Sequence, residues 1–342
     1  MMKMTRFFCG AAVLAVMISL IVPAEAFAAA GKKMRIGVSL PTQRDERWVR
    51  DAEEMRAVAK ADGVDIKMQV CDNDAARQMS QCENLLAQGI DILILAPHDA
   101  TSAGAIADNA HAAGIKVISY DRLVMGTNNV DLYVSFDNFA VGKLMGEYLT
   151  RLVPKGNYIV LAGAPTDNNA KLYREGAMEA IKPLVDKGDV KIVMDQWVTD
   201  WQPTVAMNLV QNALTANNNK IDAVLAPNDN TAGGVIQALA QVGLAGKVPV
   251  TGQDAEDTAA QRIMAGTQAM TVFKNTREQA RVAIETAIKM VRGEKPETNS
   301  VVNNKKMDVP SILLTPVVVD KANIDEVLIN SGYISKDKVY KK

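Results

Sequence analysis

The fold is decided by residues 92–122, which read ILILAPHDATSAGAIADNAHAAGIKVISYDR. Two strand-like runs, at 92–96 and 116–120, enclose a segment of helical periodicity at 102–113 that ends at Gly114. The two runs are continuously apolar at their centres, which is typical of strands buried on both faces of a sheet. This stretch therefore predicts a βαβ unit in a parallel sheet.

The same alternation covers the chain in two successive rounds. In the first round we expect further strands at 34–40 and 65–70, with helices at 50–62 and 75–88. A second round begins after Asp137 and Asn138. For it we expect strands at 157–162, 191–195, 223–226, 248–251 and 269–273, and helices at 141–152, 170–184, 204–216, 231–242 and 257–265.

The last part of the chain holds a helix at 276–292 and a strand at 312–319, too few elements for a third domain. We expect them to complete the two sheets, which requires the chain to cross between lobes three times. The predicted fold is α/β, with two similar doubly wound parallel-sheet lobes. We expect an N-terminal lobe of residues 34–137 plus 275–308 and a C-terminal lobe of 138–274 plus 309–342.

The first thirty residues differ from the rest. Lys3 and Arg6 precede an almost unbroken apolar run at 7–22, and small residues in an Ala-x-Ala arrangement follow at 24–28. This pattern predicts a signal peptide over residues 1–28 and an exported protein, with an uncleaved membrane anchor as the alternative. Export permits a disulfide between Cys71 and Cys82, but the apolar pattern around them favours two buried free thiols.

Composition excludes several classes of protein. Lys+Arg 38 against Asp+Glu 39 gives a net charge of −1, so nothing in the overall charge attracts nucleic acid or anionic lipid. Only 2 His and 3 Cys among 342 residues argue against a zinc or iron centre, and we expect no metal and no cofactor. Neither G-x-G-x-x-G nor G-x-x-x-x-G-K-[ST] occurs, which argues against a phosphate-binding turn.

Polar and aromatic residues follow almost every predicted strand. In open α/β sheets ligands bind beyond the carboxyl ends of the strands, so these residues are the candidate site. They are Arg47, Trp48, Asp121, Arg122, Asp167, Asn168, Asn169, Trp197, Trp201, Asn228, Asp229, Asp254 and Lys274.

The chemistry of this set favours a neutral polyol. Planar polar groups of both charges can donate to and accept from hydroxyl groups, and tryptophan offers a flat face to a sugar ring. Each residue also has a simpler interpretation: Asp121 and Arg122 as a surface ion pair, Asn228 and Asp254 as helix caps, Trp197 as core packing. The prediction rests on their falling at the same end of successive strands.

Evidence for catalysis is weaker. His98 follows a predicted strand and could act as a base, but no G-x-S-x-G motif or paired nucleophile accompanies it. Asp121 and Asp254 could form the carboxylate pair of a secreted glycosidase. We expect a binding protein rather than an enzyme.

Several longer motifs resemble those of the periplasmic sugar-binding proteins of the ribose/galactose/xylose cluster, over roughly residues 34–340. The most specific are ERW at 46–48, SYDR at 119–122, SFDN at 135–138, PTDNNAKL at 165–172, LTANNNKIDAV at 214–224, TGQDA at 251–255 and DVPS at 308–311. The first loop, PTQRD at 41–45, and residues 123–129 depart from the family pattern.

The resemblance implies a type I periplasmic binding fold with a three-segment hinge. It implies a pentose ligand, D-xylose before ribose or arabinose, and delivery to the permease and ATPase of an ABC transporter by a monomeric periplasmic protein. The implied sugar contacts are Arg47, Trp48, Asp121, Arg122, Asp167, Asn169, Trp201, Asn228, Asp254 and Lys274.

Two alternatives stay open at this point. The liganded protein could serve a chemoreceptor or a sensor kinase instead of a transporter, and both partners would contact the same lobe faces. A sugar-responsive repressor shares the fold, but the predicted signal peptide and the absence of a basic helix-turn-helix argue against it.

Overall fold

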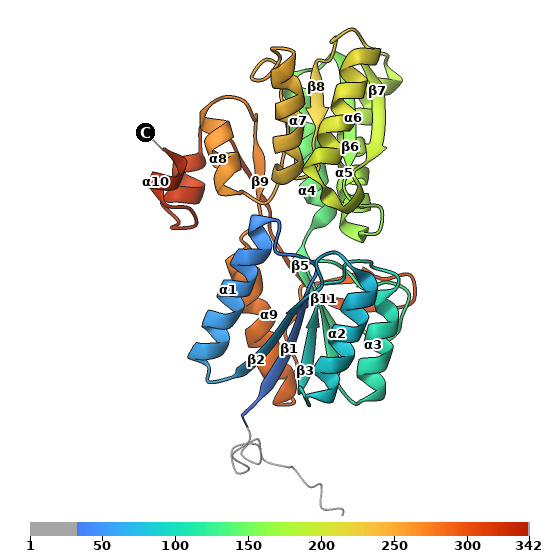
Figure 1. The fold of residues 1–342 in the computed structure, drawn as a ribbon, viewed down its shortest axis with the longest axis vertical. Helices are drawn as coiled ribbons and strands as arrows, with labels where there is room; N and C mark the ends of the chain where they lie inside the picture. Colours follow the sequence, from blue (N-terminus) through green and yellow to red (C-terminus); the bar gives the residue numbers. More distant parts are fainter. Residues whose placement is uncertain (1–32, 341–342) are drawn as a thin grey trace, which may run out of the picture. The chain divides into compact units, whose positions relative to one another are not determined.

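The larger of two groups of strands forms a mostly parallel sheet (Figure 1). The computed structural model describes residues 33–340, and the expected signal peptide at 1–28 lies outside the described residues. The strand order is β10-β11-β5-β4-β3-β1-β2, and within it β10 and β11 are antiparallel. Its strands are β1 (Arg35–Leu40), β2 (Asp65–Val70), β3 (Ile92–Leu95), β4 (Lys116–Tyr120), β5 (Leu132–Phe136), β10 (Ser300–Asn303) and β11 (Asp308–Leu314).

Helices cover both faces of this sheet. One face packs against α1 (Glu46–Ala61) and α9 (Thr276–Val291), and the other against α2 (Ala75–Ala87) and α3 (Ala103–Ala112). Figure 1 shows α1 and α9 on one side of the strands and α2 and α3 on the other. Every residue of β3 is fully buried, which confirms the strand that the ILIL run predicts.

The second group of strands combines a parallel sheet, β7-β6-β8, with the antiparallel pair β12-β9. Isolated bridges at Val250 and Gln253 join the two parts, so the strand expected at 248–251 is reduced to a single bridge. The strands are β6 (Gly156–Ala162), β7 (Val190–Trp197), β8 (Ala223–Leu225), β9 (Thr271–Phe273) and β12 (Val317–Val319).

Helices also cover this second group on both faces. Helices α4 (Asn138–Leu152) and α5 (Asn168–Asp186) share one apolar core with the strands, and α6 (Pro203–Ala216) and α7 (Asp229–Gln241) share another. A further cluster unites α8 with the C-terminal segments. The remaining helical elements are η2 (Thr199–Trp201), α8 (Asp257–Met264), η3 (Asp325–Ile329) and α10 (Lys336–Val339).

Within residues 33–340 the chain passes between the two groups of strands three times: from β5 to α4, from β9 to α9 and from β11 to β12. One part of the expected division is wrong. The single strand expected at 312–319 is two strands, and residues 309–314 belong to the first sheet because β11 pairs with β5. The break falls at Thr315 and Pro316, where proline has no N–H to continue a ladder.

The two cysteines in the described part of the chain, Cys71 and Cys82, are buried and free. This agrees with the preferred interpretation of the sequence. Burial raises the pKa of the Cys82 thiol to about 11, so it behaves as a small apolar side chain.

Helices α4 and α5 touch through their backbones. A Cβ atom placed on Gly142 of α4 would fall on the carbonyl oxygen of Tyr173, and one on Gly176 of α5 would fall on that of Phe139. The absence of a side chain at each glycine therefore sets the distance between the helices.

Asp229, the first residue of α7, joins three segments from a buried position. Its carboxylate accepts hydrogen bonds from the backbone nitrogen of Glu256 at 3.1 Å, from Nε2 of Gln268 at 2.7 Å and from Oγ1 of Thr271 at 2.9 Å. Burial raises the pKa of Asp229 to about 7, although the nearby Arg262 opposes the rise.

We expect Gly142→Ala to lower the free energy of unfolding by about 2 kcal/mol, because the added methyl group forces the two helices apart. Gly233→Ala, within α7, is the matched control. Its Cβ would lie 3.3 Å from Nη1 of Arg262, the end of a flexible side chain. Urea denaturation measures both variants, and equal stabilities would show that the helix contact is not tight.

We also expect the stability to fall as pH rises from about 4 to about 7 because of Asp229. In that window the folded chain keeps a proton on this carboxyl group that the unfolded chain has released. The contribution is at most about 1.4 kcal/mol per pH unit. Urea denaturation at about pH 5, 6 and 7 should give a smaller slope for Asp229→Asn than for the wild type, and parallel slopes would contradict the assignment.

Candidate functional site

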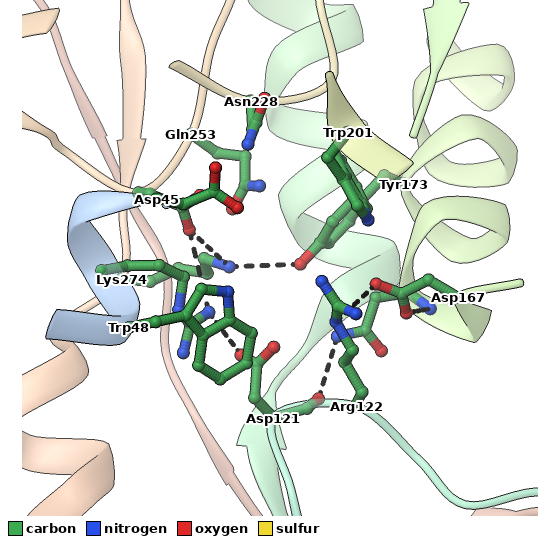
Figure 2. Close-up of a pocket in the computed structure, with 13 residues that line it drawn as sticks. Asp45, Trp48, Asp121, Arg122, Asp167, Tyr173, Trp201, Asn228, Gln253 and Lys274 are labelled. Carbon is green, nitrogen blue, oxygen red and sulfur yellow. Dashed lines mark hydrogen bonds and ion pairs between the residues drawn. The ribbon is translucent and has the colours of Figure 1, made fainter. Parts of the chain in front are cut away.

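A cavity of about 280 Å³ lies among the loops that follow the strands of both groups (Figure 2). All ten predicted contact residues line it, so the expectation that these strand ends meet in one place is correct in geometry. Three further residues line it as well. The full set is Asp45, Arg47, Trp48, Asp121, Arg122, Asp167, Asn169, Tyr173, Trp201, Asn228, Gln253, Asp254 and Lys274.

Short segments at strand ends and helix starts position these side chains. Arg47 and Trp48 lie in the first turn of α1, and Asp121 and Arg122 directly follow β4. Lys274 follows β9, at the second crossing between the groups of strands. Parallel strands bring their carboxyl ends to one edge of a sheet, which explains why residues so distant in sequence meet here.

Two helix N-caps line the cavity, and one of them, Asn228, was considered as a cap from the sequence. The cap interpretation of Asp254 is wrong, because the N-cap of the next helix, α8, is Glu256. Asn228 is the N-cap of α7, and its Oδ1 accepts from the backbone nitrogen of Thr231 at 2.9 Å. Asp167 is the N-cap of α5, and its Oδ1 accepts from the backbone nitrogen of Asn169 at 2.9 Å. Because capping uses only part of each side chain, the two interpretations are compatible at these positions.

A buried ionic network holds Arg47 in place. Its Nη1 donates to Oδ1 of Asp121 at 2.6 Å and its Nη2 to Oδ2 of Asp51 at 2.9 Å. Tyr120 donates its hydroxyl to the other oxygen of Asp51 at 2.9 Å. The guanidinium is therefore fixed from two sides before any ligand is present.

The electrostatics follow from this network. Burial alone would lower the pKa of Arg47, but Asp121, Asp51 and Asp254 raise it well above the ordinary value. Burial opposes ionisation of Asp121, yet Arg47, Lys274 and Arg122 hold the pKa of this carboxyl group below its ordinary value. Burial raises the pKa of Asp51 to about 6, although the neighbouring Arg47 opposes the rise.

Two more ion pairs complete the cavity wall. Nζ of Lys274 lies 2.8 Å from Oδ1 of Asp254 and donates to the hydroxyl of Tyr173 at 3.2 Å. Nε of Arg122 lies 2.8 Å from Oδ2 of Asp167. Every cation of the wall thus has a carboxylate partner, which fits a ligand of no net charge.

Three wall residues, Asp121, Trp201 and Asp254, have unusual backbone conformations. The φ angle is 58° at Asp121 and 103° at Asp254, in a region that residues other than glycine rarely adopt. Such conformations cost on the order of 1–3 kcal/mol each and concentrate at functional sites. The strain supports a binding role for both carboxylates.

Tryptophan rings bound the cavity on two sides. The Arg47 guanidinium lies 4.3 Å from the ring centroid of Trp48, and Trp201 meets Tyr173 edge to face with centroids 6.3 Å apart. For Trp197 the sequence allowed either core packing or a place in the site, and the structure shows neither. Its side chain is 36% exposed and does not line the cavity. It lies at the end of β7.

The cavity offers unused hydrogen-bonding groups. Within residues 33–340, Nε1 of Trp201 and Oε1 of Gln253 are buried without a partner. One is a donor and the other an acceptor, and a hydroxyl group can satisfy both kinds. Together with the paired charges, this suits a small polar molecule with several hydroxyl groups.

Sequence reasoning missed Asp45, Tyr173 and Gln253. Asp45 and Gln253 adjoin predicted contacts in loops after strands, so extending each strand-end set by one or two residues would have found them. Tyr173 lies inside α5 and reaches the cavity only through helix packing. His98, considered as a base, lies outside the wall, with Nε2 3.9 Å from Oδ1 of Asp200.

Residues 33–340 contain no candidate metal cluster and no candidate membrane-spanning helix. No group of three or more His, Cys, Asp or Glu side chains in residues 33–340 could hold a metal ion. In the same residues no helix is long and apolar enough to cross a membrane.

Known proteins resemble this chain over nearly all its length. It is 44% identical to the "D-xylose-binding periplasmic protein" of Escherichia coli K12, over 90% of this chain and 92% of that protein. The protein of the same description from Haemophilus influenzae is 43% identical, over 90% and 93%.

Solved structures agree. A carbohydrate transporter solute-binding protein from Chloroflexus aurantiacus, in complex with D-glucose, has a TM-score of 0.84 and 36% identity, covering 91% of this chain and 99% of that one. The family model described as "Periplasmic binding protein domain" matches residues 36–295. With its α/β fold, its three crossings and these relatives, the chain belongs to the periplasmic binding protein family.

Proposed function

We propose that this chain binds a monosaccharide, D-xylose, in the cavity between its two groups of strands and delivers it to an ABC transporter. The observation that carries the proposal is the cavity wall, where two tryptophans and three cation–carboxylate pairs surround a volume of about 280 Å³.

The sugar contacts we propose are the ten predicted residues together with the three additional wall residues. Paired charges can hydrogen-bond hydroxyl groups without demanding a charged ligand, and Trp48 and Trp201 can pack against the C–H faces of the ring. Because the chain belongs to a family of binding proteins, its function is binding and not catalysis.

Relatives supply the choice of sugar. Two proteins described as binding D-xylose are 44% and 43% identical over 90% of this chain. A second candidate is D-glucose, which occupies related structures at 36% and 33% identity. The two sugars differ by one hydroxymethyl group, so direct titration separates them.

We further propose that two lobes close over the sugar. The N-terminal lobe comprises residues 34–137 and 275–314, and the C-terminal lobe comprises 138–274 and 315–342, with the last boundary moved to follow β11. A sugar that touches both lobes binds the closed form better, and this difference shifts the population toward closure.

The proposed location is the periplasm, and the proposed partners are the transporter's permease and ATPase, with the chain acting as a monomer. A chemoreceptor or sensor kinase is the alternative partner. Uptake of labelled D-xylose in a deletion strain, with and without this chain, tests delivery separately from binding.

Isothermal titration is the direct test of the proposal. We expect D-xylose to bind with a Kd on the order of 1 μM, equivalent to about −8 kcal/mol, and D-glucose to bind more weakly. For about ten heavy atoms this is about 0.8 kcal/mol per atom, below the limit for very small ligands. Tighter binding of D-glucose than of D-xylose would make D-glucose the preferred ligand. The absence of binding heat with every pentose and hexose would refute sugar binding.

A second expected outcome concerns Asp254. Removing its carboxylate in Asp254→Ala leaves Lys274, which is only 1% exposed, without its charged partner. We expect the D-xylose affinity to fall by about 2 kcal/mol or more, the loss typical of a charged hydrogen bond.

The matched control for this variant is Asp195→Ala. This residue forms an ion pair with Arg174 and does not line the cavity. Calorimetry should show nearly unchanged affinity for the control, and equal affinities of both variants would remove Asp254 from the site.

A further inference from the structure

The loop at 41–45 reaches across to the second group of strands. Nη2 of Arg44 donates to the backbone carbonyl of Asp200 at 2.6 Å, and its Nε lies 3.3 Å from Oδ1 of Asp45. The same oxygen of Asp45 accepts from Nδ2 of Asn230, in α7, at 2.6 Å. The loop thus contacts two separate elements of the opposite side, and Arg44 itself does not line the cavity.

The turn that Arg44 contacts, Asp200–Trp201, contributes Trp201 to the cavity wall. Asp200 and Trp201 have consecutive positive φ angles of 51° and 56°, and neither residue is glycine. Each costs on the order of 1–3 kcal/mol, so the turn persists only while surrounding contacts hold it. The ring of Trp201 packs directly on Gly163, where a Cβ atom would overlap it, and its other side faces the cavity.

A second side chain, His98, approaches the same turn from a loop of the first group of strands. Nε2 of His98, from the loop after β3, lies 3.9 Å from Oδ1 of Asp200. Arg44 on the carbonyl and His98 near the carboxylate therefore contact Asp200 from one side of the cavity, while Trp201 belongs to the other. No element within the second group of strands makes an equivalent hydrogen bond to that carbonyl among residues 33–340.

We propose that Arg44 is a positioning residue that holds the Asp200–Trp201 turn closed over the bound molecule and thereby slows its release. The proposal rests on the proposed function and adds to it a determinant of residence time outside the cavity wall. Because Arg44 touches the turn and not the ligand, it affects all ligands of the site to a similar degree.

The consequence for kinetics is specific. A contact that forms only after the sugar has entered and the lobes have closed changes the dissociation rate and leaves the association rate nearly unchanged. Loss of one charge-assisted hydrogen bond from a partly exposed arginine corresponds to about a five- to tenfold faster dissociation.

Stopped-flow measurement of tryptophan fluorescence with D-xylose tests this on the full chain. For Arg44→Ala we expect dissociation to be about five- to tenfold faster and association within about twofold of the wild type. Arg44→Lys, which keeps a donor for the carbonyl, should restore part of the residence time. The control is Arg77→Ala, which removes an exposed arginine paired with Asp72 at 2.7 Å, and it should leave both rates unchanged.

A second measurement separates positioning from direct contact. The ratio of D-xylose to D-glucose affinities should stay the same in Arg44→Ala, whereas a changed ratio would mean that Arg44 touches the ligand and would overturn the proposal. If the wild-type chain binds sugar but Arg44→Ala dissociates at the wild-type rate, the positioning role of Arg44 is overturned and the proposed function stands. Failure of the wild-type chain to bind any sugar overturns the proposed function as well.

Discussion

The buried guanidinium of Arg47 is the charge around which the site is built. It joins α1 to Asp121 after β4, and through Asp51 to the hydroxyl of Tyr120 within β4. Its Nη2 also lies 3.2 Å from Oε1 of Gln279 in α9. A charge so deeply buried is tolerable only with partners on several sides, and those partners tie the first turn of α1 to the end of β4 and to α9.

The pairing of Arg47 with carboxylates also determines which net charge the site favours in a ligand. Asp121 and Asp51 neutralise it before a ligand arrives, and Lys274 and Arg122 are likewise paired with Asp254 and Asp167. A charged ligand would have to displace one of these partners, whereas a polyol can share their lone pairs and protons. The preference for a neutral ligand therefore follows from pairing within the wall.

Much of this arrangement could be predicted from the sequence because it depends on local patterns. Continuous apolar runs and terminal glycines locate strands and helices, and residues that follow strands in one sheet must meet at one edge. The ten predicted contacts line the cavity for that reason. Tyr173 was not predicted because its position at the cavity depends on how α5 packs on α4, through Gly142 and Gly176. The spacing of residues in the sequence does not reveal this packing.

Two of the failures within the fold share a cause. Strand β5 went unpredicted and β11 was joined to β12, because both lie where the chain leaves one sheet for the other. An apolar run shows that a segment is extended, but only pairing with a neighbour decides which sheet it enters. Pro316 marked a break within 312–319, yet its role as a crossing follows only from the pairing of β11 with β5.

The second crossing between the groups of strands runs through the cavity wall, because Lys274 lies at that crossing and lines the cavity. Lys274 directly follows β9 and lines the cavity, and the next residue, Asn275, caps α9 by accepting from the backbone nitrogen of Glu278 at 3.2 Å. A displacement of Lys274 would therefore reach, within one residue, the start of a helix that packs on the first sheet. The cavity wall and the second crossing are thus adjacent in the backbone, at Lys274 and Asn275.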